Sequence, residues 1–85
     1  MFVVYILYSE KRDRYYIGHT ANLNDRLERH NAGRSKSTKA GIPWKLMYSE
    51  VFGTKPEAYQ REMEIKRMKF RKYIERLIDE EHPDF

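Results

Sequence analysis

Val3-Val4-Tyr5-Ile6-Leu7-Tyr8, followed after a charged link by Tyr15-Tyr16-Ile17-Gly18-His19, is the stretch of sequence that decides the fold. Both runs are rich in β-branched and aromatic residues, which favour strands. The polar link Glu10–Arg14 is short, so the two runs predict an antiparallel hairpin. Gly18 lies inside the second run, and a residue without a side chain there indicates that another group approaches the backbone closely.

A helix is predicted after the hairpin, with Thr20 or Asn22 as its N-cap and Asn31 near its end. Arg26 and His30 are four residues apart, so their side chains lie one above the other on this helix. They flank its apolar stripe. We therefore expect both side chains at the boundary between the helix and the sheet rather than on the solvated side.

A basic loop and a third strand follow. The loop, Gly33–Gly41, reads GRSKSTKAG and begins with a glycine that stops the preceding helix. A solvated connector and a contact with phosphate are about equally favoured for it, since loops often carry function. The third strand is predicted over Trp44–Phe52, with Leu46 and Tyr48 facing inward.

Two helices complete the chain. Thr54-Lys55-Pro56-Glu57 fits a capping box with a proline in the first turn, and it predicts a helix that runs to about Lys69. A final helix is predicted from about Arg71 to Asp79, with Phe70 as an apolar anchor. Its apolar stripe consists of Ile74, Leu77 and Ile78.

Glu62 lies in the middle of the apolar Ala58–Ile65 face of the first of these two helices. A carboxylate on such a face is costly to desolvate unless a cation or hydrogen-bond donors meet it. The simplest explanation is an ion pair with Arg61 or Lys66. The alternative is a role in a functional site, and we prefer Glu62 for that role to Glu57, which serves the cap.

The element order β-β-α-β-α-α predicts an α+β fold, in which a small three-stranded antiparallel sheet is flanked by helices. At 85 residues the chain is expected to form one domain, 1–85, with a core of about 2–70 and a C-terminal helix of about 71–80. The absence of cysteine excludes disulfides, cysteine-rich zinc sites and thiol nucleophiles.

The net charge of +4 favours a polyanionic partner. Basic residues concentrate in Arg34–Lys39 and in Arg61–Lys72. The apolar opening Met1–Tyr8 is far shorter than the roughly 20 residues that span a bilayer, and it lacks the basic leader of a signal peptide. We therefore expect a cytoplasmic protein that does not associate with a membrane.

Five residues together supply the groups that phosphodiester cleavage needs, namely Tyr5, Tyr16, Arg26, His30 and Glu62. Each also has an ordinary explanation, since such tyrosines are most often core aromatics. A phenol with a pKa near 10 is almost entirely neutral at pH 7. A catalytic phenolate therefore requires a guanidinium or a metal ion nearby. The arginine and the histidine share one helix face beside the strand pair, which favours an anion as their ligand.

In this order the residues resemble the GIY-YIG nuclease family over nearly the whole chain, from Val3 to about Lys69. The first signature of the family reads Val3-Val4-Tyr5, with valine in place of glycine, and the second reads Tyr16-Ile17-Gly18 without change. The helix motif of the family, an arginine followed four residues later by a histidine, is matched by Arg26-Leu27-Glu28-Arg29-His30. Its metal-binding glutamate falls at Glu62.

Two positions depart from the family pattern. His19 stands where excision-repair members carry a lysine, and Phe70–Leu77 holds no counterpart of an asparagine that several members have. His19 is a candidate proton carrier or phosphate donor, although a histidine at the end of a strand is commonly exposed to solvent. In size the chain resembles the stand-alone bacterial members, which are similar to the nuclease module of DNA excision repair.

The resemblance implies a divalent-metal-dependent endonuclease that hydrolyses DNA. Glu62 would hold one Mg²⁺ or Mn²⁺ ion, and either Tyr5 or Tyr16 would deprotonate or orient the attacking water. Arg26 would stabilise the pentavalent phosphate. His30 would support the arginine or pass a proton.

Contacts with the nucleic-acid backbone, without readout of sequence, are expected beside this site. The residues assigned to them are Gly18, His19, Arg34, Lys36, Lys39, Lys66 and Lys69. The sequence leaves open RNA as a substrate, the need for a protein partner and the oligomeric state. Two alternatives to an active enzyme are a non-catalytic nucleic-acid-binding module and a subunit that needs a partner for activity.

Overall fold

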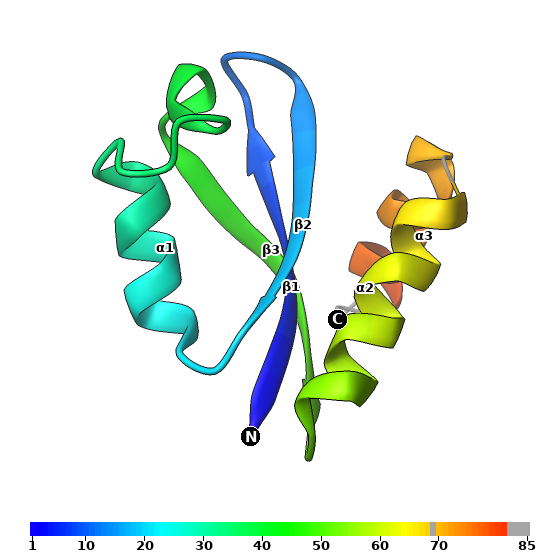
Figure 1. Cartoon of the computed structure of the whole chain (residues 1–85). Coiled ribbons are helices and arrows are strands. Elements are labelled where there is room, and N and C mark those ends of the chain that lie inside the picture. Colours follow the sequence, from blue (N-terminus) through cyan, green and yellow to red (C-terminus); the bar gives the residue numbers. More distant parts are fainter. Residues whose placement is uncertain (69, 82–85) are drawn as a thin grey trace.

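The computed structural model describes residues 1–68 and 70–81, and it confirms the predicted order of elements (Figure 1). The elements are β1 (Phe2–Ser9), β2 (Arg14–Thr20), α1 (Leu23–Asn31), a short 3₁₀ turn (Lys39–Gly41), β3 (Trp44–Phe52), α2 (Lys55–Met68) and α3 (Arg71–Glu81). Helix α1 covers one face of the sheet, and α2 and α3 cover the other. Within the described residues, no helix combines the length and the apolar character needed to cross a membrane.

The sheet is antiparallel throughout, with the strand order β2-β1-β3. Strand β1 therefore lies in the centre, and its residues 4–7 are all buried. Successive side chains of a strand point to opposite faces, so one set packs toward α1 and the other toward α2 and α3. This explains why β1 reads as a continuous apolar run rather than as an alternation of apolar and polar residues.

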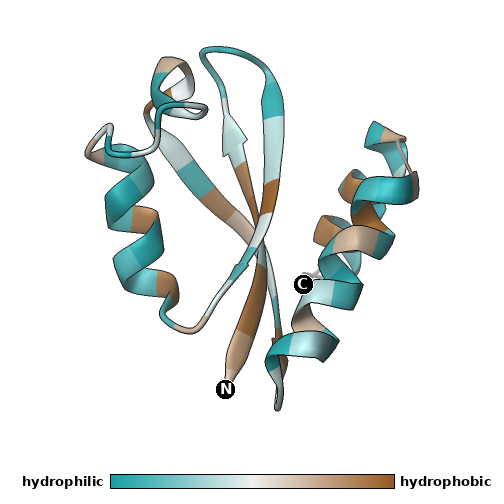
Figure 2. Ribbon diagram, viewed as in Figure 1, coloured by the Kyte–Doolittle hydropathy of each residue, from teal (hydrophilic) through white to brown (hydrophobic). Residues whose placement is uncertain are grey.

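Each face of the sheet has its own core. The core between the sheet and the helices α2 and α3 consists of Val4, Ile6, Ile17, Ala58, Ile65 and Leu77. The core on the α1 side consists of Tyr5, Leu7 and Trp44, with Tyr16, Leu23, Leu27 and Ile42 packed against it. Figure 2 shows the strands as largely apolar in their middle and α1 as mostly hydrophilic. The α1 side therefore has the smaller core, and it is the side that contains the candidate tyrosines.

A β-bulge in β3 changes which side chains of this strand face inward. Ile6 pairs with Tyr48. Leu7 pairs with Leu46, so Met47 has no partner on β1. The bulge leaves Tyr48 packed against the core beside α2 and α3, whereas Leu46 lies on the other face and is 40% exposed. The prediction that Leu46 faces inward is therefore wrong, because the bulge interrupts the two-residue period on which it rested.

Phe70 does not anchor α3, contrary to the prediction. It immediately precedes the helix, its carbonyl accepts a hydrogen bond from the Tyr73 amide, and its side chain is 68% exposed. Tyr73 and Ile74 pack against the core instead, next to the buried Leu77. Lys69, the predicted end of α2, lies outside the described residues.

The predicted helix caps are confirmed. Asn22 is the N-cap of α1, and its side chain accepts a hydrogen bond from the Asp25 amide at 3.0 Å. Thr54 and Glu57 form the capping box of α2, in which each side chain accepts from the amide of the other, at 3.4 and 3.2 Å. Gly33 follows α1 with a φ of 76°, a left-handed conformation that glycine adopts without strain.

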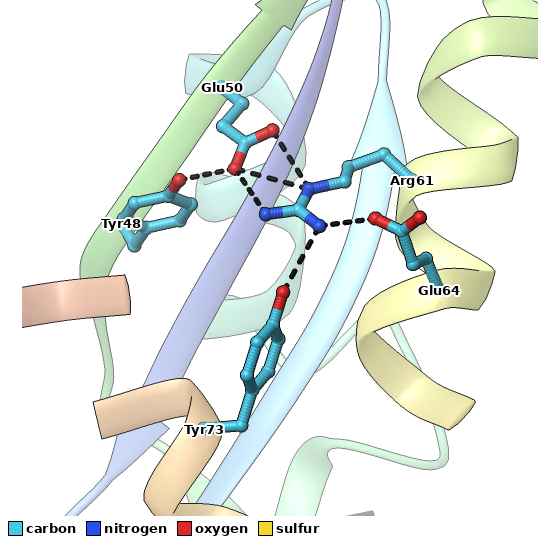
Figure 3. A network of polar contacts seen from close by, with 5 residues as sticks. All are labelled: Tyr48, Glu50, Arg61, Glu64 and Tyr73. Atoms are coloured by element: carbon cyan, nitrogen blue, oxygen red, sulfur yellow. Dashed lines mark hydrogen bonds and ion pairs between the residues drawn. The ribbon is translucent and has the colours of Figure 1, made fainter. Parts of the chain in front are cut away.

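A polar network around Arg61 ties α2 to the sheet and to α3 (Figure 3). The guanidinium donates to both carboxylate oxygens of Glu50 on β3, at 3.0 to 3.2 Å, and to the Tyr73 hydroxyl of α3 at 3.2 Å. Glu64 and Tyr48 complete the network. Burial raises the pKa of Glu50, but hydrogen bonds from the arginine and from Tyr48 outweigh it, so the pKa is lowered. These contacts add polar links to the apolar packing of α2 on the sheet.

We expect Gly18→Ala to destabilise the protein by about 1–3 kcal/mol, the usual cost of overpacking. An alanine Cβ at this position would lie 2.6 Å from the Tyr5 hydroxyl oxygen. Gly53→Ala is the matched control, since its Cβ would be 3.9 Å from the nearest atom, Glu57 Oε1, and its effect should stay within about 0.5 kcal/mol. Urea denaturation followed by circular dichroism measures both, and equal stabilities would contradict the close approach of the phenol.

Candidate active site

Tyr5 and Tyr16 lie close together on the face of the sheet that α1 covers. Their ring centroids are 6.2 Å apart. The Tyr5 phenol occupies the space that Gly18 leaves on β2, because a Cβ at this glycine would be 2.6 Å from the phenol oxygen and 3.2 Å from the Tyr16 ring. The close approach predicted from the glycine is confirmed, and the approaching group is a candidate catalytic side chain.

His30 of α1 joins the two tyrosines. Its imidazole is almost fully buried, and the ring centroid lies 4.8 Å from that of Tyr16. Its Nε2 atom is 3.2 Å from the Tyr5 hydroxyl oxygen. Its Nδ1 atom is 2.9 Å from Oγ1 of Thr38, a residue of the basic loop. Both ring nitrogens are therefore engaged inside the protein.

One tautomer of His30 satisfies all of these contacts. A hydroxyl has a single hydrogen, and Thr38 donates its hydrogen to the carbonyl oxygen of Ser35 at 3.4 Å. In the tautomer of His30 that carries Nδ1–H, Thr38 accepts from Nδ1–H and Nε2 accepts from the Tyr5 hydroxyl, so every one of these contacts is satisfied. Tyr5, His30 and Thr38 thus form one directed chain of hydrogen bonds that leads a proton away from the phenol.

Burial keeps both the Tyr5 phenol and the His30 imidazole neutral at pH 7. It raises the pKa of Tyr5 to about 12, and the nearby Tyr16 and Glu62 add to the increase. Arg26 acts in the opposite direction without cancelling it. Burial also lowers the pKa of His30, in the same direction as two nearby arginines of α1. A neutral phenol beside a neutral imidazole can pass a proton to it.

Arg26 is a half-buried cation at the boundary between α1 and the sheet, as predicted. Its guanidinium is close enough to Tyr5 to lower the pKa of that phenol. No acidic side chain in residues 1–68 and 70–81 forms an ion pair with it, whereas the half-buried Arg61 binds two carboxylates. A guanidinium in this setting is suited to bind a phosphate through two parallel hydrogen bonds.

Glu62 lies on the other side of the sheet, on α2. Its carboxylate is buried on the face of the helix that packs against the sheet, as predicted. The Oε1 atom is 2.6 Å from Nδ1 of His19, and the Oε2 atom is 2.6 Å from Nζ of Lys66. Of the two ion-pair partners considered from the sequence, Lys66 is therefore confirmed, and Arg61 binds other carboxylates.

His19 connects the two halves of the site. It follows Gly18 on β2, so it points to the opposite face of the sheet from the Tyr5 phenol, toward α2. The Glu62 carboxylate that it binds is near enough to raise the pKa of Tyr5. The His19 side chain is only 20% exposed. The Tyr59 ring packs edge-on against it, with the two ring centroids 5.8 Å apart. The ordinary explanation, a strand-end histidine that is simply exposed to solvent, does not apply here, because α2 covers the side chain.

The donor set at Glu62 fits one hard cation. A carboxylate offers about four lone-pair positions, of which His19 and Lys66 occupy two. Mg²⁺ binds through one or two carboxylates together with water and phosphate oxygens. In the described part of the chain, no cluster of three or more potential ligand side chains holds a metal by itself, so water and substrate would complete the coordination.

The basic loop between α1 and β3 supplies both exposed cations and a buried hydroxyl. Thr38 is buried, and the indole of Trp44 donates to its carbonyl oxygen at 2.8 Å. Sequence reasoning missed its contact with His30, because a threonine among serines and lysines forms no local pattern. The three exposed cations are Arg34, Lys36 and Lys39. Lys69, the remaining predicted contact with nucleic acid, lies outside the described residues.

Comparison with known proteins finds a family model and several proteins that are similar to this chain. The chain matches a family model described as GIY-YIG catalytic domain over residues 1–74, a range that includes all five candidate catalytic residues. A UPF0213 protein of Bacillus licheniformis is 47% identical over 66 residues, which make up 76% of this chain and 67% of that protein. A UPF0213 protein of Streptococcus pneumoniae serotype 4 is 43% identical over 67 residues, with coverages of 76% and 68%.

A solved structure is similar to this chain over most of its length. The solution NMR structure of a UPF0213 protein from Bacillus halodurans is similar to this chain with a TM-score of 0.58 and 31% sequence identity. The similarity covers 93% of this chain and 84% of that one. It therefore extends over the sheet and the helices on both of its faces.

We expect Thr38→Val to cost about 1–3 kcal/mol of stability, because the change removes the acceptor of a buried N–H group of His30. Valine has nearly the same shape. Ser37→Ala, at the neighbouring exposed hydroxyl, is the control, and its effect on stability should stay within about 0.5 kcal/mol.

Nitrogen chemical shifts in NMR spectra test the tautomer of His30 directly. Near neutral pH they should show a protonated Nδ1 and an unprotonated Nε2, and the reverse would contradict the chain of hydrogen bonds.

Proposed function

Because the chain belongs to the GIY-YIG family of catalytic domains, we propose that it is an endonuclease that hydrolyses phosphodiester bonds of DNA with one divalent metal ion. The observation that carries this proposal is the Tyr5 phenol, which donates to a neutral His30 beside the guanidinium of Arg26. A proton acceptor and an anion-binding group thus occupy one small site. A structural role alone does not account for a half-buried guanidinium without a carboxylate partner.

Tyr5 is the tyrosine that would activate the attacking water. With a pKa of about 12 it acts as a neutral phenol rather than as a phenolate. A water at the phenol oxygen transfers a proton to Tyr5 while Tyr5 passes its own proton to Nε2 of His30. The imidazolium that forms keeps its Nδ1–H on Thr38. Tyr16 packs its ring against the imidazole and holds it in place.

Arg26 would bind the phosphate that is attacked. A guanidinium donates to two phosphate oxygens at once and balances the negative charge that grows in the transition state. As the water oxygen bonds to phosphorus, the bond from phosphorus to the leaving sugar oxygen breaks, and that oxygen takes up a proton from solvent. The products are one strand end with a phosphate and one with a hydroxyl group.

Glu62 would hold the Mg²⁺ or Mn²⁺ ion, which supplies positive charge beside the leaving oxygen. His19 donates to Oε1 of this carboxylate and keeps it oriented. Lys66, which contacts Oε2, would turn from the carboxylate to a phosphate of the substrate. This exchange gives the lysine a role in binding nucleic acid that is consistent with its exposed side chain.

The nucleic-acid backbone would lie along the basic loop and the edge of β2. Arg34, Lys36 and Lys39 are exposed on the loop that also carries Thr38. Gly18 would contribute through the Tyr5 phenol, which fills the space that the missing side chain leaves on β2. Such contacts attract phosphates of any sequence, so we propose binding without readout of bases.

We expect plasmid or branched DNA to be cut in Mg²⁺ or Mn²⁺ and to stay intact with a chelator. Glu62→Gln, Tyr5→Phe and Arg26→Ala should each lower kcat/KM by at least about 10²-fold, the usual loss for one proton-transfer or charge-stabilising group. Glu64→Gln is the matched control, because it makes the same chemical change two residues along α2 on a 60% exposed side chain. Its cleavage rate should be nearly unchanged.

The outcome of this assay separates the proposal from its alternatives. Wild-type protein that cuts no better than Glu62→Gln would overturn the enzyme. Salt-sensitive DNA binding that survives Arg26→Ala would then support a non-catalytic binding module. A protein that neither cuts nor binds would support a subunit that needs a partner, which a pull-down from lysate would recover.

The decrease of kcat/KM at low pH should follow the protonation of the His30 imidazole. Burial lowers the pKa of its imidazole from the ordinary 6.5, and Arg26 and Arg29 act in the same direction, while Tyr5 and Tyr16 face it from the sheet. Only the neutral imidazole accepts a proton, so kcat/KM should stay constant down to about pH 6.5 and fall below it. An acid limb above that value, or an NMR titration of His30 above it, would contradict the assignment.

The free energy of unfolding should also decrease as the pH falls through the range in which His30 is protonated. Because the pKa of His30 is lower in the folded protein than in the unfolded chain, the unfolded chain takes up the proton first as the pH falls. The contribution of the neutral imidazole is therefore complete above the unfolded pKa and is lost as the pH falls through the folded one. Urea denaturation at several pH values measures this loss, which His30→Gln should abolish.

A further inference from the structure

A cleft of about 200 Å³ lies beside the candidate active site, near the turn of the β1–β2 hairpin. We call it the hairpin cleft. Arg12 and Arg14 of the hairpin and Ser37 of the basic loop line it, together with Gly41 and Trp44. None of these five residues takes part in the chemistry described above.

The hairpin cleft and the active site share two residues. Tyr16 and Thr38 line the cleft, and each also contacts His30. A group bound in the cleft is therefore separated from the proton-accepting imidazole by a single side chain. Along β2, the four steps from Gly18 to Arg14 span about 13 Å at the usual rise of a strand. A nucleic-acid strand seated at Tyr5 can reach this distance within a few nucleotides.

The lining of the hairpin cleft is basic. Arg12 and Arg14 are exposed, and within residues 1–68 and 70–81 neither forms an ion pair with an acidic side chain. Asp13 lies between them in the chain, but its carboxylate binds the Tyr8 hydroxyl and the Arg71 guanidinium, each at 2.6 Å. Among the described residues, no acidic side chain lines the cleft. Its electrostatic character therefore suits an anion.

The floor of the hairpin cleft is held in place by several hydrogen bonds. The backbone amide and carbonyl of Trp44 bind the side-chain amide of Asn31, at 2.6 and 3.0 Å, and the indole N–H donates to the Thr38 carbonyl at 2.8 Å. A Cβ at Gly41 would lie 2.4 Å from the indole ring, so only glycine allows this packing. The cleft is therefore a built feature rather than a gap between mobile side chains.

We propose that the hairpin cleft binds a terminal phosphate of a nucleic-acid strand, so that the protein prefers DNA with a strand end, such as a nick, close to the cut. This inference rests on the proposed function. The cleft is smaller than the usual 300 Å³ or more of pockets for drug-sized ligands, and it suits a single phosphate group. A terminal phosphate carries close to two negative charges, and two guanidiniums match them better than they match an internal phosphate.

Binding measured without cleavage tests the proposal. The probes are labelled duplexes with a nick that has a 5′-phosphate, a 3′-phosphate or no phosphate, and the assay is fluorescence anisotropy in a chelator. One of the phosphorylated probes should bind at least about tenfold more tightly than the unphosphorylated one, as expected for charge-assisted hydrogen bonds. Trp44 is the only tryptophan of the chain, so its fluorescence should change with that probe and not with the others.

Variants of the hairpin supply the control. Arg12→Ala and Arg14→Ala should each reduce the preference for the phosphorylated probe and abolish the change in Trp44 fluorescence. Lys11→Ala removes one positive charge from the same turn but does not line the cleft. It should lower affinity for all probes alike and keep the preference. An equal loss of preference in Lys11→Ala, or no preference in the wild type, would overturn the proposal.

Failure of this inference and failure of the proposed function give different results. Glu62→Gln does not touch the hairpin cleft, so it should keep the phosphate preference even though it cannot cut. A preference in a wild-type protein that cuts no DNA would support the cleft and overturn the enzyme. A wild type that cuts DNA but binds all three probes equally would overturn the cleft alone.

Discussion

The contact between the Tyr5 phenol and the backbone of Gly18 is the constraint on which the rest of the site depends. Strands β1 and β2 pair so that these two residues lie opposite each other, and the missing Cβ leaves space for the ring. The phenol oxygen can then reach His30 of α1. A larger residue on β2 would displace that oxygen, and the phenol would lose its contact with the imidazole.

The site draws on both faces of one thin sheet. On β2, Gly18 accommodates the phenol on the α1 side, and the next residue, His19, points to α2 and binds Glu62. Because β2 is an edge strand, groups on its two faces can meet at its open side. The network around Arg61 holds α2 on the sheet and so supports the adjacent carboxylate, although it lies outside the site (Figure 3).

Much of the fold could be predicted because its signals are local. A capping box, a glycine after a helix and a run of β-branched residues each depend on neighbours in the chain, and all of them were confirmed. The predictions failed where contacts between elements decide. A bulge opposite Leu7 turned Leu46 outward, and the position of Phe70 just before α3 exposed its ring. Thr38 could not be found at all, since its partner is eight residues away on another element.

The sequence by itself determined the elements, the family and the types of side chain available for chemistry, because periodicity, caps and signature motifs are properties of nearby residues. Only the tertiary structure decided which of these side chains meet. Tyr5 and His30 are 25 residues apart, and His19 and Glu62 are 43 apart. Such contacts arise when α1 and α2 pack on opposite faces of the sheet, and no local pattern encodes that packing. The same packing places Arg26 beside the Tyr5 phenol, whereas Arg61 forms ion pairs with two nearby carboxylates.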